Sequence, residues 1–251
     1  MSTLAVIPAR LGATRLPRKP LRLLGGEPLV VRVWQRVMRL EVTERCVIAT
    51  DSPEVSQAAA TAGAECVLTS AHHPSGTDRV AEVARLPQFQ PYDIIVNIQG
   101  DEPFVSQSMV QRAVEVVACG RAPLGTVAVA ATAEALADPH VVKVVCADDG
   151  RAMYFSRGAI PYLRNASDGE LARRLAKQHI GLYAYAREAL AAWVALPEHP
   201  LERVERLEQL RPLAAGIPLG VALVDETPPI GIDTEDDLVR ANERWSQLNA
   251  G

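Results

Sequence analysis

The sequence predicts an α/β fold with a doubly wound, mostly parallel central sheet and a small antiparallel extension. Between residues 4 and 130, short apolar or β-branched runs alternate with segments of helical periodicity, which is the pattern of repeated strand–helix units. These runs are nearly continuous, as expected for strands that helices cover on both faces. After about residue 138, apolar runs follow one another without long helices between them, which indicates antiparallel pairing.

The order of the expected elements favours a single domain over residues 1–251. Strands are expected at 4–7, 45–49, 65–68, 93–98 and 124–130, and helices begin near Pro28, Pro53, Asp78 and Ser106. An antiparallel sub-region at about 139–186 contains expected strands at 141–146, 152–155 and 180–186 and a polar stretch, 165–177, expected as a mobile loop or short helix. The remaining expected elements are a helix at 201–215, a strand at 219–224 and a helix at 234–248 with Thr234 as N-cap.

Composition and charge argue against several broad classes of protein. The formal net charge is −4, whereas a general nucleic-acid binder is usually basic, so no nucleic-acid partner is expected. No apolar run approaches the roughly 20 residues that span a bilayer, and no basic stretch precedes a long apolar one at the start, so neither a membrane segment nor a signal peptide is expected. The four cysteines lack C-x-x-C spacing and are interpreted as small buried hydrophobes in a reducing compartment. We therefore expect a cytoplasmic protein.

The loop after the first expected strand, residues 8–21, concentrates positive charge. It carries Arg10, Arg15, Arg18 and Lys19, separated by small and turn-forming residues. In doubly wound sheets, ligands bind beyond the carboxyl ends of the strands. Two or three converging cations, with backbone N–H groups, would neutralise a magnesium-bound triphosphate. Charge alone also fits a solvated basic loop, but the position after the first strand favours a nucleotide.

Two acidic positions suit a hard cation. Asp101 follows a buried strand and Gly100, a glycine that permits either a close backbone approach or a positive φ. Asp233 precedes the closing helix. Magnesium prefers a few carboxylates, with phosphate oxygens completing its octahedron. A turn cap at Asp101 and a helix N-terminal charge at Asp233 are the structural alternatives.

Two further segments carry groups suited to binding a nucleobase or a carboxylic acid. Residues 73–79 read His-Pro-Ser-Gly-Thr-Asp-Arg and form a polar turn before a helix, which also fits a helix cap at Ser75 or Thr77. Residues 154–162 contain Arg157, whose guanidinium fork suits a carboxylate and equally fits a surface ion pair.

These segments resemble the 3-deoxy-manno-octulosonate (Kdo) cytidylyltransferase family of the nucleotide-sugar pyrophosphorylase superfamily. The superfamily is indicated by Ile7-Pro8-Ala9-Arg10, Thr14-Arg15-Leu16-Pro17 and Lys19-Pro20-Leu21. The Kdo branch is indicated by segments 73–79, 96–103, 154–162, 179–183, 205–210 and 231–238. The resemblance covers nearly the whole chain, from residue 4 to about residue 240, and implies a Rossmann-like nucleotidyltransferase fold.

The resemblance implies a magnesium-dependent enzyme that transfers CMP from CTP to the anomeric 2-hydroxyl of Kdo and so serves lipopolysaccharide biosynthesis. Asp101 and Asp233 are the implied Mg²⁺ ligands. The implied catalytic residues are Arg10, Arg15, Lys19 and Asp101. The implied nucleotide-binding residues are Pro8, Ala9, Arg10, Lys19, Ser75, Gly76, Thr77, Arg79 and Gln99. The implied sugar-acid residues are Gln99, Arg157, Arg164, His179, Tyr183, Glu208 and Gln209.

The resemblance leaves the exact acceptor open. Rival interpretations are a cytidylyltransferase for 8-amino-Kdo or sialic acid, and a non-catalytic nucleotide sensor on the same sheet. The family also implies a homodimer, with residues 141–145 and 181–186 near the contact. Arg18 stands where relatives often have glycine, so the loop around Lys19 is where the geometry is expected to depart most from the family.

Overall fold

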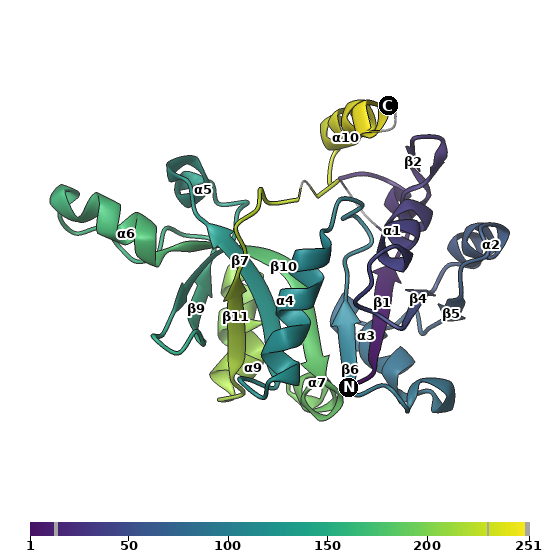
Figure 1. The fold of residues 1–251 in the computed structure, drawn as a ribbon, viewed down its shortest axis with the longest axis horizontal. Coiled ribbons are helices and arrows are strands. Elements are labelled where there is room, and N and C mark those ends of the chain that lie inside the picture. Colours follow the sequence, from purple (N-terminus) through teal and green to yellow (C-terminus); the bar gives the residue numbers. More distant parts are fainter. Residues whose placement is uncertain (13–14, 230, 249–251) are drawn as a thin grey trace. The chain divides into compact units, whose positions relative to one another are not determined.

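The computed structural model of the chain describes residues 1–12, 15–229 and 231–248 (Figure 1). Ala13 and Thr14 of the predicted nucleotide loop lie outside the described residues. The chain forms two compact units, one of Met1–Gln107 with Pro229–Gly251 and the other of Ser108–Pro228. The single domain expected from the sequence stays a prediction.

The first unit contains four parallel strands. They are β1 (Thr3–Ala9), β4 (Arg45–Thr50), β5 (Cys66–Leu68) and β6 (Ile94–Asn97), in the order β6-β1-β4-β5. In the register of β1, Leu4 lies opposite Arg45 on one side and Ile95 on the other. The side chains of residues 4–7 are fully buried, which explains the unbroken apolar run in the sequence.

The strand order reverses at β1. The chain runs from β1 through α1 (Leu29–Met38) to β4, and through α2 (Pro53–Thr61) to β5. It then returns through α3 (Gly76–Arg85) and a short 3-10 helix η2 (Pro87–Phe89) to β6, on the other side of β1. Right-handed crossovers therefore place α1 and α2 on one face and α3 on the other. Such a reversal opens a crevice beyond the carboxyl ends of β1 and β6.

The helices of this unit begin at the signals seen in the sequence. Ser52 caps α2, its Oγ accepting a hydrogen bond from Val55 N at 3.3 Å, and Pro53 occupies the first turn. Ser75 caps α3 in the same way, accepting from Asp78 N at 3.2 Å. These caps fix where each helix starts and therefore where the loop before it ends.

A small hairpin of the first unit was not predicted. It consists of β2 (Leu23–Leu24) and β3 (Glu27–Pro28), preceded by the 3-10 helix η1 (Lys19–Leu21), and it lies against α10 (Glu235–Leu248). At Gly25, φ is +54° and a Cβ atom would lie 2.3 Å from the ring of Trp245. Only glycine therefore fits this turn without displacing the tryptophan.

The second unit confirms the antiparallel extension. Its elements up to residue 186 are α4 (Gln107–Ala118), which starts at the unit boundary, β7 (Leu124–Ala130), α5 (Ala133–Ala137), β8 (Lys143–Cys146), β9 (Ala152–Ser156), η3 (Ala166–Asp168), α6 (Gly169–Leu175) and β10 (Lys177–Ala186). Strand β10 pairs antiparallel with β7 and β8, and β8 pairs antiparallel with β9. Strand β11 (Leu219–Leu223) runs parallel to β7. The fold is thus α/β with mixed pairing, as the sequence predicts.

The expected continuous helix at 201–215 is wrong. The structure has α8 (Pro200–Glu205) and α9 (Leu210–Ala214) instead, after α7 (Arg187–Ala195), which was not predicted. Arg206 ends α8 in the left-handed conformation, with φ of +55°. Pro212, which lies inside the expected helix and in the first turn of α9, is a sequence signal against one continuous helix that the periodicity argument overlooked.

Two expectations about partners and compartment can be compared with the described residues. None of the helices in the described ranges is long and apolar enough to cross a membrane. All four cysteines are free, but only Cys46 is buried, whereas Cys66 and Cys146 are half-buried and Cys119 is exposed. The interpretation of all four as buried hydrophobes is therefore wrong for Cys119.

Candidate active site

A cavity of about 340 Å³ lies in the first unit, at the carboxyl ends of β1 and β6 and the N-terminus of α3. Its walls therefore come from the loops that the strand reversal predicts. The lining residues predicted from the sequence are Pro8, Ala9, Arg10, Arg15, Lys19, Ser75, Gly76, Arg79, Gln99, Asp101 and Asp233. Thr77, also predicted to bind nucleotide, is buried and is not part of the described lining.

The two central loops approach each other closely at Gly100. A Cβ atom built on Gly100 would lie 2.9 Å from the carbonyl oxygen of Pro8, a contact that real side chains do not make. Of the two roles considered for this glycine, the close backbone approach is therefore the correct one, because its φ is not in the left-handed region. The glycine allows Gln99 and Asp101 to share the cavity wall with the first loop.

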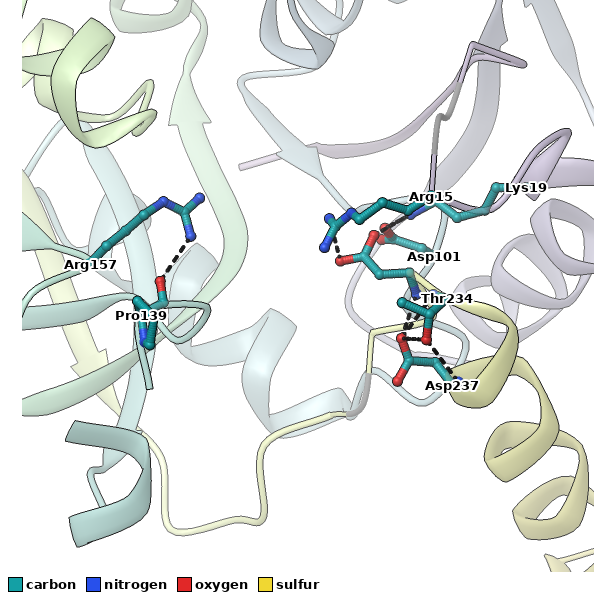
Figure 2. A network of polar contacts seen from close by, with 8 residues as sticks. Arg15, Lys19, Asp101, Pro139, Arg157, Thr234 and Asp237 are labelled. Atoms are coloured by element: carbon teal, nitrogen blue, oxygen red, sulfur yellow. Dashed lines mark hydrogen bonds and ion pairs between the residues drawn. The ribbon is translucent and has the colours of Figure 1, made fainter. Parts of the chain in front are cut away.

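Lys19 joins the two aspartates expected to bind metal. Its Nζ lies 2.5 Å from Asp101 Oδ2 and 2.8 Å from Asp233 Oδ1 (Figure 2). Arg15 Nη2 donates to the other oxygen of Asp233 at 3.0 Å. Burial alone would lower the pKa of the Lys19 ammonium, but the charges and hydrogen bonds of both carboxylates outweigh it and raise that pKa. The ammonium therefore stays charged between two carboxylates.

The backbone brings these two carboxylates into register. Ile232 N donates a hydrogen bond to the carbonyl oxygen of Asp101 at 3.1 Å. Asp233, the next residue, consequently lies beside Asp101 although the two are far apart in the sequence. The residue patterns could name both residues, but only the family resemblance implied that they meet.

Glu102 adds a third carboxyl group beside the pair. Burial and, less strongly, the negative charges of Asp101 and Asp233 together raise its pKa to about 8, although the charge of Lys19 acts in the opposite direction. Glu102 is therefore protonated and neutral near pH 7.

The guanidinium of Arg79 is buried and is held by neighbouring side chains. Its side chain is 4% exposed, its Nη1 donates to Thr69 Oγ1, and its Nη2 lies 3.5 Å from Asp51 Oδ1. Arg79 is thus a fixed charge in the cavity wall. His73, which sequence reasoning did not select, also lines the cavity, and its Nε2 pairs with Glu82.

Arg18 adopts a left-handed backbone conformation. Its φ is +56° and its ψ is +31°, which is the left-handed region. Its guanidinium pairs with Glu54, with Nη2 at 2.5 Å from Oε2. A non-glycine residue in this region is unusual and costs backbone strain. The expected departure of this loop from the family stays a prediction.

Arg157, in the second unit, is clamped from two sides. Glu205 accepts a hydrogen bond from Arg157 N at 2.8 Å and from Ser156 Oγ at 2.7 Å, and its carbonyl oxygen accepts from Arg157 Nε at 2.9 Å. The fully buried ammonium of Lys143 donates to the carbonyl oxygens of Arg157, Asp138 and Val141. Burial lowers the pKa of that ammonium. Sequence reasoning missed Glu205 and Lys143, although Glu205 opens one of the segments that carried the resemblance.

The guanidinium of Arg157 keeps donor capacity beyond this clamp. Its Nη1 reaches the Pro139 carbonyl oxygen only at 3.4 Å (Figure 2). Arg164 lies exposed in the segment after β9. Both arginines therefore offer N–H groups on the surface of the second unit.

Of the other sugar-acid candidates, His179 and Tyr183 form a buried cluster within the second unit. His179 Nε2 lies 2.9 Å from Thr126 Oγ1, and that hydroxyl donates to the Leu182 carbonyl oxygen at 2.7 Å, so His179 Nε2 is assigned as the donor. Burial lowers the pKa of His179 to about 3, so the ring is neutral. Burial also raises the pKa of Tyr183 well above its ordinary value, with smaller effects of Tyr185 and Glu208.

Little of this cluster is exposed. His179, Tyr183 and Gln209 expose 9%, 8% and 4% of their surfaces, whereas Glu208 is half-buried. His179 and Tyr183 pack ring against ring, with centroids 5.5 Å apart. His179 and Tyr183 therefore form a buried polar-aromatic pair with little exposed surface.

Comparison with known proteins identifies the family. A model of the family described as "Cytidylyltransferase" matches residues 4–219. The chain is 63% identical over 250 residues to the 3-deoxy-manno-octulosonate cytidylyltransferase of Gemmatimonas aurantiaca, an alignment that covers 100% of this chain and 96% of that protein. The chain belongs to the 3-deoxy-manno-octulosonate cytidylyltransferase family. The protein of that name from Polynucleobacter asymbioticus is 44% identical over 96% of this chain and 94% of its own length.

Solved structures agree with this membership. A CMP:2-keto-3-deoxy-manno-octonic acid synthetase complexed with CTP has a TM-score of 0.90 and 36% identity, covering 99% of this chain and 100% of that one. A cytidylyltransferase from Leptospira borgpetersenii has a TM-score of 0.61 at 16% identity, over 100% of this chain and 96% of its own. The second likeness concerns the fold alone. The family resemblance read from the loop motifs is therefore confirmed over the whole chain.

Proposed function

We propose that this Kdo cytidylyltransferase family member transfers CMP from CTP to the anomeric 2-hydroxyl of Kdo, giving CMP-Kdo and pyrophosphate for lipopolysaccharide biosynthesis. The observation that carries the proposal is the meeting of Asp101, Asp233 and Lys19 on one wall of the cavity. A site that only binds a nucleotide has little need of two carboxylates beside its phosphates. The 63% identity to a protein named for this reaction supports the same conclusion.

Triphosphate binding is assigned to the cations of the first loop. A triphosphate carries about four negative charges, and Arg10, Arg15 and Lys19 all line the cavity. When the α-phosphorus is attacked, the bond to the β-phosphate oxygen breaks and pyrophosphate leaves with the electron pair. The three cations stabilise that developing charge, which is the main contribution a protein makes to phosphoryl transfer.

The acceptor oxygen forms the new bond. The 2-hydroxyl oxygen of Kdo attacks the α-phosphorus in line, and its proton passes to water. No covalent intermediate with the protein is required, because positioning supplies most of the rate. Cytosine is assigned to the Ser75–Arg79 turn, where the fixed guanidinium of Arg79 faces the cavity.

Two aspartates fit a divalent cation. Asp101 and Asp233 each place a carboxylate oxygen within 2.8 Å of the same nitrogen, Lys19 Nζ, so both can reach one small cation together with phosphate oxygens. Magnesium bound there would supply charge neutralisation and would orient the phosphates. Asp101 and Asp233 would hold it, and Lys19 would then turn to the phosphates.

Kdo carboxylate binding is assigned to Arg157. Its backbone is fixed by Glu205 and Lys143. Arg157 would therefore lose little conformational entropy when its guanidinium forms a bidentate contact with the Kdo carboxylate. Arg164, Gln99, Glu208 and the accessible edges of His179, Tyr183 and Gln209 are the proposed partners of the sugar hydroxyls.

A homodimer is proposed on the antiparallel sub-region. Leu182 to Tyr185 are buried within one chain, so those side chains offer no contact surface. Met153, Tyr162 and Leu163 expose 63%, 87% and 44% of their surfaces and supply apolar area on the same sub-region. Light scattering at micromolar concentration should give twice the mass of one chain, and a single-chain mass would refute this.

The proposed reaction is tested by pyrophosphate release from CTP with Mg²⁺. Kdo should support release, whereas replacement of CTP by UTP or ATP, or addition of EDTA, should abolish it. Parallel reactions with 8-amino-Kdo and sialic acid distinguish the acceptor. Faster release with either of those acids would overturn the assignment of Kdo, and CTP binding without release for any acid would indicate a nucleotide sensor.

A further inference from the structure

Asp237, on the first turn of α10, directs one carboxylate oxygen at the turn that carries Asp233. Its Oδ2 accepts hydrogen bonds from Asp233 N at 3.1 Å, Thr234 N at 2.9 Å and Thr234 Oγ1 at 2.8 Å (Figure 2). Asp237 N in turn donates to Thr234 Oγ1 at 3.1 Å. Its other oxygen, Oδ1, accepts from Arg240 Nη2 at 2.5 Å. Both carboxylate oxygens are thus engaged, and one of them holds the backbone of Asp233.

The helix that carries Asp237 is itself fixed to the rest of the first unit. Asn242 Oδ1 accepts from Gly25 N at 2.9 Å, and Asn242 Nδ2 donates to the Leu23 carbonyl oxygen at 3.2 Å. At the start of the same helix, Glu235 Oε2 accepts from Arg22 Nη2 at 2.7 Å. Helix α10 is therefore a rigid support, and Asp237 extends that rigidity to the turn before it.

The other side of Asp233 is held as well. Ile232 N donates to the Asp101 carbonyl oxygen at 3.1 Å, which fixes the residue before Asp233 to the loop of the other aspartate. With the Asp237 contacts after it, the Asp233 backbone is fixed on both sides. The Asp233 side chain, by contrast, is 44% exposed, and its hydrogen bonds in the described structure are with the cations Lys19 and Arg15. Its direction therefore depends on its backbone.

We propose that Asp237 is a positioning residue, which aims the carboxylate of Asp233 at the cation shared with Asp101. The inference rests on the proposed function, in which those two aspartates hold Mg²⁺. A small divalent cation requires nearly fixed ligand positions, and groups that orient its ligands are worth about 10- to 100-fold in affinity. An ordinary helix cap would instead affect stability without affecting the metal.

Mn²⁺ binding in the presence of CTP, without Kdo and so without turnover, tests this inference by electron paramagnetic resonance. Asp237→Ala should weaken Mn²⁺ binding about 10- to 100-fold, because no acceptor then holds the Asp233 turn. Asp237→Asn keeps an acceptor oxygen and should retain most of the affinity. Metal-free CTP binding, measured with EDTA, should change by less than about twofold in both variants, since neither touches the nucleotide loops.

Two control variants separate positioning from capping. Thr132→Ala removes an N-cap in the second unit, where Thr132 Oγ1 accepts from Ala135 N at 3.1 Å, and should leave Mn²⁺ affinity unchanged. Arg240→Ala removes the partner of Asp237 Oδ1 without touching the turn and should have a small effect. Should Asp237→Ala fail to fold, Thr234→Ala should weaken Mn²⁺ binding in its place, by a smaller factor, because it removes the hydroxyl that donates to Asp237 Oδ2 and accepts from Asp237 N.

The outcomes distinguish the inference from the proposed function beneath it. If the wild-type protein binds Mn²⁺ with CTP and the Asp237→Ala or Thr234→Ala variant binds it equally well, the positioning role is refuted and the metal assignment stands. If the wild-type protein binds no Mn²⁺ with CTP, the metal assignment and the positioning role are both refuted.

Discussion

Replacing Lys19 by methionine should destabilise the metal-free protein and make it bind divalent cations more tightly. The ammonium neutralises two carboxylates at 2.5 and 2.8 Å, and methionine keeps an apolar stem without the charge. The side chains of Lys19, Asp101 and Asp233 are 17%, 25% and 44% exposed, so the loss should lie between that of surface and buried pairs, at about 1–2 kcal/mol. For a chain of this size, that loss lowers Tm by about 2–8 °C.

The stability lost should be regained with metal. A cation that binds the native protein adds RT ln(1 + [L]/Kd) to stability, and without Lys19 it no longer has to displace an ammonium. Differential scanning fluorimetry with and without Mg²⁺ should therefore show a larger Tm rise for Lys19→Met than for wild type, and Mn²⁺ titration without CTP should show a lower Kd. Arg45→Met is the matched control, because it breaks an ion pair of the same unit away from the cavity. Equal metal responses in Lys19→Met and wild type would refute the shared site.

Three further predictions concern single side chains. Asp101→Asn should lower kcat about 100- to 1,000-fold while circular dichroism shows a folded protein, and near-normal turnover would refute its catalytic role. Arg157→Lys should raise the KM for Kdo about 10-fold or more with little change in the KM for CTP, because an ammonium cannot reproduce the bidentate fork; equal changes in both KM values would contradict the assignment. In metal-free buffer, wild-type stability should fall as pH rises from about 4.5 to about 8, because the native state keeps the Glu102 proton that the unfolded chain releases. Urea unfolding of Glu102→Gln should lack that component of the pH dependence, and an identical profile for both proteins would contradict the raised pKa.

Local signals in the sequence predicted the strands and helices with the clearest patterns. β7 has the predicted bounds of Leu124–Ala130, and α2 begins at Pro53 after the capping residue Ser52. Pro212 argues against one continuous helix over 201–215, but the left-handed conformation of Arg206 that ends α8 is one that local sequence does not favour. Tertiary contacts around Glu205 and Arg211 hold that segment, including the ion pair of Arg211 with Glu202.

The candidate site was predictable where it depends on topology. Loops after parallel strands meet at one edge of the sheet, so the first loop and Asp101 could be expected together. The pairing of Asp233 with Asp101 came only from the family resemblance. It requires the chain to return to the first unit at Pro229, after the whole second unit, and no local pattern predicts that return. The clamp of Glu205 and Lys143 on Arg157 was missed for a similar reason, since a buried lysine in a strand gives no signal that its ammonium will meet three carbonyl oxygens.

Product analysis tests the central claim most directly. Purified protein is incubated with CTP, Kdo and Mg²⁺, and CMP-Kdo and pyrophosphate are quantified together by mass spectrometry and ³¹P NMR. We predict that CMP-Kdo and pyrophosphate form in equal amounts, that both disappear with EDTA, and that Asp101→Asn forms them at least about 100-fold more slowly. Pyrophosphate release without CMP-Kdo, or equal product formation in the presence of EDTA, would contradict the claim.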